Sequence, residues 1–552
     1  MKTTQPLSKF LIVLFLATLS AGSITAQDLE TRVDALLTEQ YPTDGPGATA
    51  LIAKDGKVIY RKAFGMANLE LGVPMKPENV FEIGSITKQF TAVSILMLEE
   101  QGKLNIEDEI TKFIPDYPTH GKKITIHELL NHTSGIKSYT DLPDLRDLAR
   151  KDLEPLELID VFKDEPMDFD PGTEYRYNNS GYILLGYIIE KVSGMSYADF
   201  VQKNIFDKVG MTSSYYGSKT TLIPNRASGY MPSENGYRNA DYLSMTLPYA
   251  AGSIMSTVDD LLKWQNAITA NELISEASKK KAHTGYDLTS GDPIYYGYGW
   301  SVDEINDVPT IEHGGGIFGY TTYGIYIPGE EVYVAVLTNS NGNSPTDVSV
   351  RIAAHAIGKP FPDNKSAATL TAEQMKKWTG TYEFDGGIVR FITYEDGTLY
   401  SQREGSGKMR LMAVSPTDFQ FENSFSAYKF GMESGKKVAN FSSRIRSGKG
   451  MISDRKPPAE KEAIAVAPEI LATYTGKYEL QPGFVIEVTT EEDKIYAQAT
   501  GQPRAELFGE SEDTFFLRVV NAKMVFNKTE DGSVASLTLH QGGQEMEAKK
   551  LH

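Results

Sequence analysis

The spacing of hydrophobic residues divides the chain into one long N-terminal region and two shorter C-terminal regions. In the first region, residues 27–360, apolar residues recur at helical spacing over 182–192 and 257–270. Short continuous apolar runs occupy residues 48–53 and 332–337. Long helical patterns combined with short strand-like runs are typical of a domain that mixes helices with a sheet. We therefore expect one α+β domain here.

The C-terminal part of the chain changes to short alternating runs, and it does so twice. The segment Trp378-Thr379-Gly380-Thr381-Tyr382-Glu383 is echoed by Tyr474-Thr475-Gly476-Lys477-Tyr478-Glu479. The offset of 96 positions (378 to 474) is shared by Tyr400 and Tyr496. Repeats of this kind predict two successive all-β domains, at 370–455 and 466–552, each a small closed barrel or sandwich. Proline-containing linkers at 360–366 and 456–461 separate the three regions.

The N-terminus has the layout of an export signal. Lys2 and Lys9 precede the apolar run 10–19, and small residues follow up to Ala26. This order predicts a signal peptide over residues 1–26, cleaved on export to the periplasm or the extracellular space. A membrane anchor is the alternative, but the run is short for a span, and no later segment is long and apolar enough. We expect a soluble, secreted mature protein.

Composition narrows the choice of chemistry. The 552 residues include no cysteine, which excludes disulfides and thiolate metal sites. There are 55 Lys and Arg residues against 73 Asp and Glu residues, a net charge of −18. An acidic chain argues against nucleic acid and against anionic membrane surfaces as partners. It places no limit on small-molecule or short-peptide substrates.

Ser85 and Lys88 form the first candidate catalytic pair. They open a predicted amphipathic helix that runs to Glu100, and an amine one turn away can take the proton of a serine hydroxyl. The helix N-terminus favours a developing anion and disfavours a protonated lysine. Five other Ser-x-x-Lys copies occur in the chain, so the pattern alone is weak. The alternative is a helix-capping serine followed by a solvated lysine.

Two further segments supply candidate partners. Tyr177 and Asn179 follow a Pro-Gly turn and precede a helical pattern, which predicts a loop held by a rigid element. A tyrosine in such a place is more often half-buried packing than an acid or base. His313 begins a glycine cluster beside a strand-like run, where N–H groups can face an oxyanion. Its alternative is a glycine-rich hairpin with an incidental histidine.

Ser85-x-x-Lys88, Tyr177-x-Asn179 and His313-x-Gly315 occur in this order with these flanks. Together they resemble the serine β-lactamase and penicillin-binding-protein-like superfamily, closest to its class C, D-aminopeptidase and esterase branch. The resemblance spans about residues 30–355. It implies an antiparallel sheet flanked by helices, with a helical subdomain. It also implies a serine hydrolase that needs no cofactor and no metal.

The resemblance assigns roles to the motif residues. Ser85 would attack a carbonyl to form an acyl-enzyme, while Lys88 and Tyr177 share the proton transfers, one of them being deprotonated. Asn179 would orient Lys88, and His313 would hold Tyr177. The N–H groups of Ser85 and Gly316 would form the oxyanion hole. Residues predicted to contact substrate are Gly314, Gly315, Tyr298, Trp300, Phe318 and Tyr320, although each aromatic ring is equally explained as core.

The third motif shapes the substrate prediction. Relatives that recognise a penicillin or a terminal D-Ala carboxylate usually carry a hydroxyl residue where this chain has Gly314. His-Gly-Gly and two C-terminal β domains resemble D-aminopeptidases more, which favours D-aminoacyl peptide, amide or peptidoglycan-derived substrates. A β-lactamase or an esterase of the same fold is the alternative. A catalytically silent protein whose β repeats bind glycan or a partner is the alternative from another class. The sequence leaves the oligomeric state open.

Overall fold

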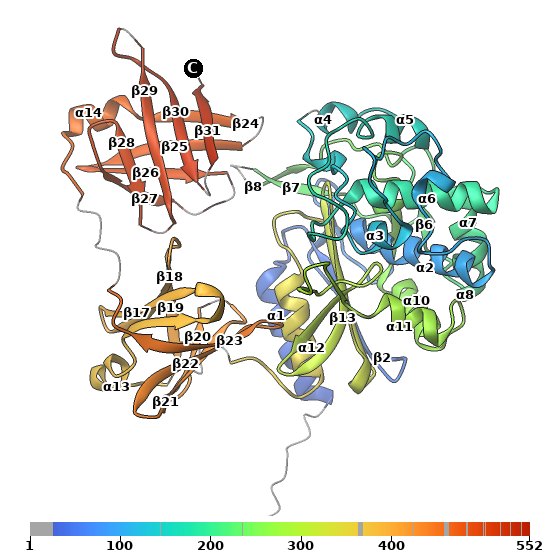
Figure 1. Ribbon diagram of the computed structural model, residues 1–552, viewed down its shortest axis with the longest axis horizontal. Coiled ribbons are helices and arrows are strands. Elements are labelled where there is room, and N and C mark those ends of the chain that lie inside the picture. Colours follow the sequence, from blue (N-terminus) through green and yellow to red (C-terminus); the bar gives the residue numbers. More distant parts are fainter. Residues whose placement is uncertain are drawn as a thin grey trace, which may run out of the picture.

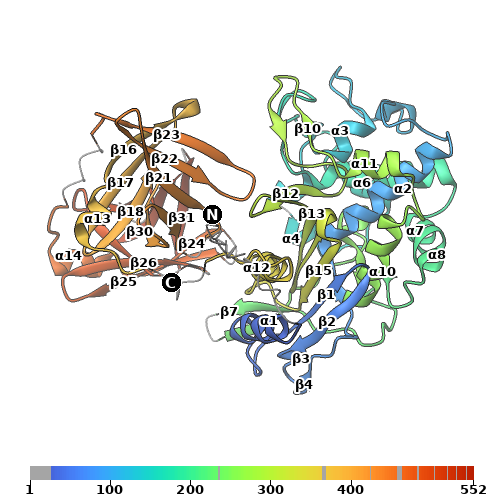
Figure 2. The same cartoon turned by 90° about the horizontal axis from the view of Figure 1, so that it is seen from below.

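The computed structural model describes residues 26–551, except 144, 234–235, 363–367, 423, 457–462, 482–483, 501, 503, 519, 530 and 542–543. Residues 1–25, which make up nearly all of the predicted signal peptide, lie outside the described residues. The described chain forms an N-terminal domain and two barrels, and both barrels lie on the same side of that domain (Figures 1 and 2). The predicted α+β class with two small β domains is confirmed.

A six-stranded antiparallel sheet is the centre of the N-terminal domain. Its strand order is β12 (Ser301–Ile305), β13 (Val308–Ile317), β14 (Tyr320–Ile327), β15 (Val332–Thr338), β1 (Ala48–Lys54) and β2 (Lys57–Phe64). Alternate residues of β15 enter two different apolar clusters, one on each face. A strand buried on both faces reads as a continuous apolar run, which explains the pattern at 332–337.

Helices cover both faces of this sheet (Figure 2). One face packs against α1 (Ala26–Gln40) and α12 (Thr346–Ala356). The other face packs against α10 (Val258–Thr269) and the helical subdomain. The longer helices of that subdomain are α2 (Thr87–Glu100), α6 (Asn179–Ser193) and α11 (Glu276–Ala282). Its shorter helices are α3 (Ile126–Leu130), α4 (Leu145–Leu148), α5 (Pro155–Asp160), α7 (Tyr197–Val201), α8 (Asp207–Val209) and α9 (Tyr249–Gly252).

Short strands complete the N-terminal domain. β5 (Phe81–Glu82), β9 (Ile254–Ser256) and β6 (Tyr215–Tyr216) form a three-stranded sheet. The two-stranded ribbons are β3 (Met66–Asn68) with β4 (Val73–Pro74), β7 (Tyr230–Ser233) with β8 (Gly236–Asn239), and β10 (Tyr286–Asp287) with β11 (Pro293–Ile294). The β5–β9 pairing matters most for function because it fixes the start of the segment that carries Ser85.

Each C-terminal repeat is a closed eight-stranded antiparallel barrel in which consecutive strands pair. The first barrel contains β16 (Gly380–Phe384), β17 (Val389–Glu395), β18 (Thr398–Arg403), β19 (Lys408–Ala413), β20 (Asp418–Phe421), β21 (Ala427–Glu433), β22 (Lys436–Ser442) and β23 (Ser447–Ser453). The second contains β24 (Gly476–Gln481), β25 (Phe484–Glu491), β26 (Lys494–Ala499), β27 (Ala505–Gly509), β28 (Thr514–Leu517), β29 (Ala522–Lys528), β30 (Val534–Gln541) and β31 (Gln544–Lys550). Closure pairs every strand edge, which resolves the barrel-or-sandwich alternative.

The repeated sequence segment has the same structural task in both barrels. A short helix, α13 (Ala372–Lys376) or α14 (Pro468–Thr473), precedes it. The hydroxyl of Tyr382 donates to the backbone oxygen of Trp378 at 2.9 Å, and that of Tyr478 donates to the backbone oxygen of Tyr474 at 2.7 Å. The sequence repeat at an offset of 96 residues therefore contains a tyrosine whose hydroxyl links the first strand of each barrel to the end of the preceding helical segment.

An arginine of the first barrel enters the N-terminal domain. Arg444, between β22 and β23, donates to both carboxylate oxygens of Glu312 in β13, at 2.9 and 2.8 Å. It also lies 3.1 Å from an oxygen of Asp303 and donates to the Glu304 carbonyl. A bidentate arginine–carboxylate pair is among the stronger polar contacts in proteins. This contact joins the first barrel to the strand that carries His313.

Within the described residues, no helix has both the length and the apolar character needed to cross a membrane.

Candidate active site

Ser85 lies in a single 3₁₀ turn, η1 (Gly84–Ile86), that joins β5 to α2. Sequence reasoning placed it in the first turn of an amphipathic helix, and both parts of that prediction need correction. The α-helix begins only at Thr87, and every residue of α2 up to Leu98 is buried. The helix has no solvent face because α6, α9, α11 and other elements pack around it.

Glycines allow strand β13 to approach this turn. Gly84 has φ +51°, and a β-carbon there would lie 2.9 Å from the Gly316 nitrogen. A β-carbon at Gly315 would lie 2.0 Å from the Ile83 carbonyl oxygen. Side chains at these two positions would force the strand away from the serine. The glycine cluster is therefore part of β13 itself, not a hairpin loop.

Lys88 is completely buried and has three polar neighbours. Its Nζ atom lies 2.8 Å from Asn179 Oδ1, 2.9 Å from the Ala251 carbonyl oxygen and 3.1 Å from Ser85 Oγ. Burial holds the pKa of Lys88 well below its usual value, so the neutral amine is favoured. Among the described residues, the titratable neighbours of Lys88 are tyrosines and histidines, and no salt bridge to a carboxylate opposes this effect.

A neutral amine fits the geometry around Lys88. It has two N–H donors and one lone pair, and the two carbonyl oxygens can only accept. The lone pair is then left for the Ser85 hydroxyl, which donates to it. This arrangement makes Lys88 the base and Ser85 the group from which a proton is drawn.

Asn179 is the first residue of α6, and capping interactions fix its position. The preceding Asn178 is the N-cap and accepts from the Gly181 N–H at 2.8 Å. The amide nitrogen of Asn179 donates to Thr140 Oγ1 at 3.1 Å, which leaves its oxygen directed at Lys88. Predicted as a loop residue, it gains its orientation from the helix start.

Tyr177 lies over the catalytic pair. Lys88 Nζ is 4.9 Å from the centre of its ring, and its hydroxyl interacts with the Ser85 side chain. About 37% of the Tyr177 residue surface remains exposed, yet desolvation around its hydroxyl raises the Tyr177 pKa. Of the two groups predicted to share the proton transfers, Lys88 is therefore the one that is deprotonated at rest.

His313 differs from its expected contact. Its ring centre lies 6.1 Å from that of Tyr177, and the described hydrogen bonds lead elsewhere. Nδ1 lies 2.5 Å from the Gly314 carbonyl oxygen and therefore donates to it, so Nε2 accepts from the Tyr296 hydroxyl at 2.9 Å. Burial lowers the pKa of His313 to about 3. The ring is neutral, and it acts on Tyr177 through packing.

Sequence reasoning missed three groups at this site: the Ala251 carbonyl, Tyr296 and His132. The ring of His132 lies 4.3 Å from that of Tyr177 and 4.6 Å from that of Tyr296. Its Nδ1 accepts from the Asn178 N–H at 3.1 Å. Burial lowers its pKa well below the usual value, so it too is neutral. A backbone carbonyl has no sequence signal, because every residue carries one.

The predicted substrate contacts separate into two groups. Tyr298, Trp300 and Tyr320 are at most 3% exposed and belong to the core, so their substrate-contact assignment is corrected. Trp300 stacks on the core residue Trp264, for example. Phe318 is only partly buried, and Gly316 is exposed next to Ser85. Gly314 packs against the Tyr323 ring on the opposite side of β13.

Arg444 acts on the opposite face of the same strand. Glu312 and His313 are consecutive in β13, so their side chains point to opposite faces. Glu312 is 2% exposed and also accepts from the Tyr323 hydroxyl at 2.9 Å. Burial raises the pKa of Asp303 to about 6, and the adjacent Arg444 opposes the rise. The first barrel thus supports the active-site strand from behind.

The chain is similar in sequence to known proteins over most of its length. A family model described as Beta-lactamase matches residues 33–359, and a model described as a domain of unknown function (DUF3471) matches residues 460–550. Penicillin-binding protein 4* of Bacillus subtilis is 29% identical over 516 residues, covering 91% of this chain and 94% of that protein. D-aminopeptidase of Gluconobacter oxydans is 28% identical, covering 62% of this chain and 64% of that protein.

Solved structures agree with the fold. The octameric penicillin-binding protein homologue from Pyrococcus abyssi superposes with a TM-score of 0.54 and 28% identity, covering 77% of this chain and 99% of that one. D-amino acid amidase from Ochrobactrum anthropi superposes with a TM-score of 0.54, covering 60% of this chain and 99% of that one. Its 22% identity supports the fold alone.

Proposed function

Because this chain belongs to the Beta-lactamase family of serine hydrolases, we propose that it forms an acyl-enzyme at Ser85 and hydrolyses D-aminoacyl peptides or amides. One observation carries the proposal. The buried Nζ atom of Lys88 lies within hydrogen-bond distance of two carbonyl oxygens and of Ser85 Oγ, so a neutral amine that donates to both carbonyls keeps its lone pair for the Ser85 hydroxyl. A serine that only capped a helix would not need a desolvated base at this distance.

In the acylation step, Lys88 takes the Ser85 proton while Oγ bonds to the substrate carbonyl carbon. The carbonyl electrons move to oxygen, and the N–H groups of Ser85 and Gly316 stabilise the resulting oxyanion. Lys88 is then an ammonium with three donors, two of them held by Asn179 and Ala251. The third faces the reacting centre and returns the proton, through or alongside Tyr177, to the leaving amine as the carbon–nitrogen bond breaks.

In the deacylation step, water replaces the departed amine. Lys88, neutral again, takes a proton from water while the water oxygen bonds to the ester carbon. The tetrahedral intermediate collapses, the Ser85–acyl bond breaks and the proton returns to Ser85 Oγ. The raised pKa of Tyr177 suits a hydroxyl that relays a proton without being ionised at rest.

The third motif and the relatives support the substrate class. Gly314 offers no hydroxyl for a substrate carboxylate, which argues against a terminal carboxylate clamp. One relative is named a D-aminopeptidase, and it covers 62% of this chain. β-Lactam and simple ester hydrolysis are the rival activities of the same fold.

Export completes the proposal. Lys2, Lys9 and the apolar run 10–19 have the order of a cleaved secretory signal, so the enzyme would meet its substrate outside the cytoplasm. Expression of the full chain in a bacterial host and N-terminal sequencing of the exported product test this. A mature N-terminus near residue 26 is expected, whereas retention of Met1 in the cytoplasm would contradict export.

A substrate panel tests the activity. The mature chain is assayed on D-alanine and L-alanine p-nitroanilides, a chromogenic cephalosporin and p-nitrophenyl butyrate. We expect kcat/KM for the D-amide to exceed that for the L-amide by at least about tenfold. Preferred turnover of the cephalosporin or the ester would instead assign one of the rival activities. No turnover, with no covalent adduct at Ser85, would favour a binding protein.

A further inference from the structure

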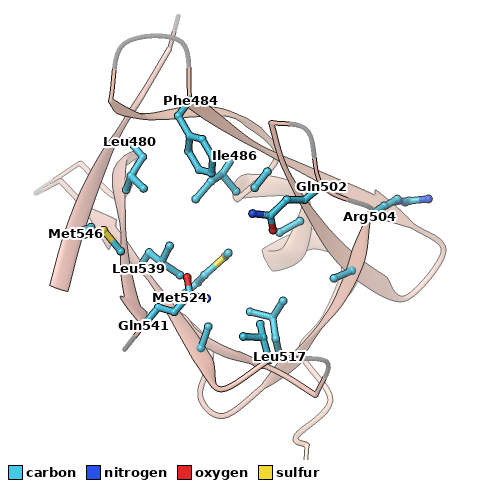
Figure 3. A pocket seen from close by; sticks show the side chains of 15 residues that line it. Leu480, Phe484, Ile486, Gln502, Arg504, Leu517, Met524, Leu539, Gln541 and Met546 are labelled. Carbon is cyan, nitrogen blue, oxygen red and sulfur yellow. The ribbon is translucent and has the colours of Figure 1, made fainter. Parts of the chain in front are cut away.

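We infer that the second barrel is a binding site for a single alkyl chain with a small uncharged polar head. The barrel encloses a cavity of about 550 Å³ (Figure 3). This volume is in the usual range for small-molecule pockets. The inference is independent of the proposed hydrolase activity, because the cavity lies within β24–β31 and its lining includes no residue of the N-terminal domain.

The cavity occupies one end of the barrel. Its lining residues come from the end where β24 meets β25, β26 meets β27, β28 meets β29 and β30 meets β31. The opposite end is filled by aromatic rings, with Tyr474 stacked on Phe526 at 4.3 Å and Phe515 edge-on to Phe526. The interior is thus closed at one end and hollow at the other.

The first barrel shows that this hollow is not a general property of the fold. Around the cavity, the strand pairings of β19–β22 and β27–β30 show which positions of the two barrels correspond. Where the first barrel has Phe421, Tyr428 and Phe441, the second has the smaller residues Leu517, Met524 and Leu539. The three rings of the first barrel pack with centres 5.1–6.1 Å apart.

Two more matched positions show the same difference. Arg390 of the first barrel lies 4.3 Å from the centre of the Phe441 ring, and its counterpart is Ile486. Ser401, 3.0 Å from the Tyr428 hydroxyl, is replaced by Ala497. At these five positions the first barrel has three aromatic rings and two polar side chains. The second barrel has apolar side chains without aromatic rings at all five. Protein interiors are otherwise close-packed, so an apolar space of this size indicates a ligand.

The lining identifies the chemistry of the occupant. Leucine, isoleucine, methionine, valine, alanine and phenylalanine side chains form most of the wall. The amides of Gln502 and Gln541 point into the space, whereas the Arg504 guanidinium points away from it (Figure 3). Arg504 is paired with Glu491 at 3.1 Å and stacks on the Tyr496 ring. The cavity therefore offers an apolar wall and amide hydrogen bonds, without a free charge.

Fluorescence titration of the full mature chain with N-phenyl-1-naphthylamine, an uncharged apolar probe, tests the inference. We expect saturable binding of one probe per chain, displaced by decanol at least about tenfold more effectively than by decanoate at pH 8. Equal displacement by decanoate would overturn the uncharged-head assignment. No saturable binding would overturn the site itself.

Variants locate the site. The triple variant Leu517→Phe/Met524→Tyr/Leu539→Phe transplants the rings of the first barrel, and Ala497→Phe narrows the cavity with a single change. Either variant should weaken probe binding at least tenfold. If the triple variant does not fold, Ala497→Phe alone provides the test. Tyr496→Phe, the next position on the same strand, is the control and should bind normally. Unchanged binding in a folded Ala497→Phe variant, or loss of binding in Ser85→Ala, would contradict the assignment.

Discussion

The interiors of the N-terminal domain and the second barrel differ in polarity and in packing. Around Ser85, buried polar groups such as Lys88 and His313 are paired with carbonyl and hydroxyl partners. In the second barrel, apolar side chains line an unfilled volume of about 550 Å³. Desolvation makes a lysine reactive, whereas unfilled apolar volume makes a binding site. If both proposals hold, one chain separates catalysis from ligand binding, and we expect that either can be removed by mutation without loss of the other.

Ser85→Ala should have the largest effect. Without the nucleophile, kcat/KM on the D-amide should fall by about 10³-fold or more, because only binding and the oxyanion hole remain. Probe binding by the second barrel should be unchanged. Steady-state kinetics and fluorescence titration of the same preparation measure both. Ser434→Ala, which alters an exposed copy of the Ser-x-x-Lys pattern, should retain full activity.

Lys88→Met should lower kcat/KM by about 10²- to 10⁴-fold, since it removes the proposed base. In the parent enzyme the active form is the neutral amine, so kcat/KM should rise with pH through the depressed Lys88 pKa and then level off. Lys88→Arg keeps a cation that cannot give up its proton and should be inactive at every pH. Wild-type activity that declines as pH rises from 5 to 8 would contradict a neutral Lys88.

The same lysine links stability to pH. Its pKa is lowered in the folded state, so between that value and 10.5 the unfolded chain binds a proton that the native chain does not. Stability should therefore rise with pH over this interval. Thermal unfolding at pH 5 and pH 8 should show a smaller rise in Lys88→Met than in the parent. An equal rise in both would place the titrating group elsewhere.

Arg444→Met should have an intermediate effect. It leaves Glu312 buried without its cation, and we expect an unfolding free-energy loss of about 3 kcal/mol. Displacement of β13 should lower kcat/KM about tenfold. Protonation relieves unpaired carboxylates, so both losses should be greater at pH 8 than at pH 5. Arg446→Met, at an exposed position of the same turn, is the control, and equal losses in both variants would contradict a supporting role for Arg444.

Filling the second barrel should have the smallest effect on catalysis. Ala497→Phe should leave kcat/KM on the D-amide within about twofold of the parent, since no substrate-binding residue lies in the barrel. The assay on the p-nitroanilide measures it. A loss of tenfold or more in the folded variant would show that barrel and active site are coupled, and the comparison between them would then fail.

Much of this architecture was readable from the sequence because it depends on local patterns. Ser85 and Lys88 lie one helical turn apart in the sequence. The segment that contains Tyr478 repeats the segment that contains Tyr382. The contact of Lys88 with the Ala251 carbonyl was not readable, because any residue supplies a backbone oxygen. Trp300 was ambiguous for a related reason, since an aromatic ring gives the same sequence signal in a core as in a pocket.

The cavity of the second barrel could not be predicted from the sequence, for a different reason. The echo at 96 positions identifies the repeat, but the strand pairings are needed to show that Phe421 and Leu517 occupy the same place. Likewise, nothing around Arg444 in the sequence indicates that it reaches Glu312 across a domain boundary. Both features are properties of three-dimensional register.

The most direct test of the central claim is the intact mass of the mature chain after incubation with a fluorophosphonate, followed by peptide mapping. The proposal predicts one adduct per chain, located on the peptide that contains Ser85 and absent from Ser85→Ala. It also predicts that labelling slows as pH falls and Lys88 becomes protonated. A chain that remains unlabelled, or that is labelled equally in Ser85→Ala, would contradict an acyl-enzyme at Ser85.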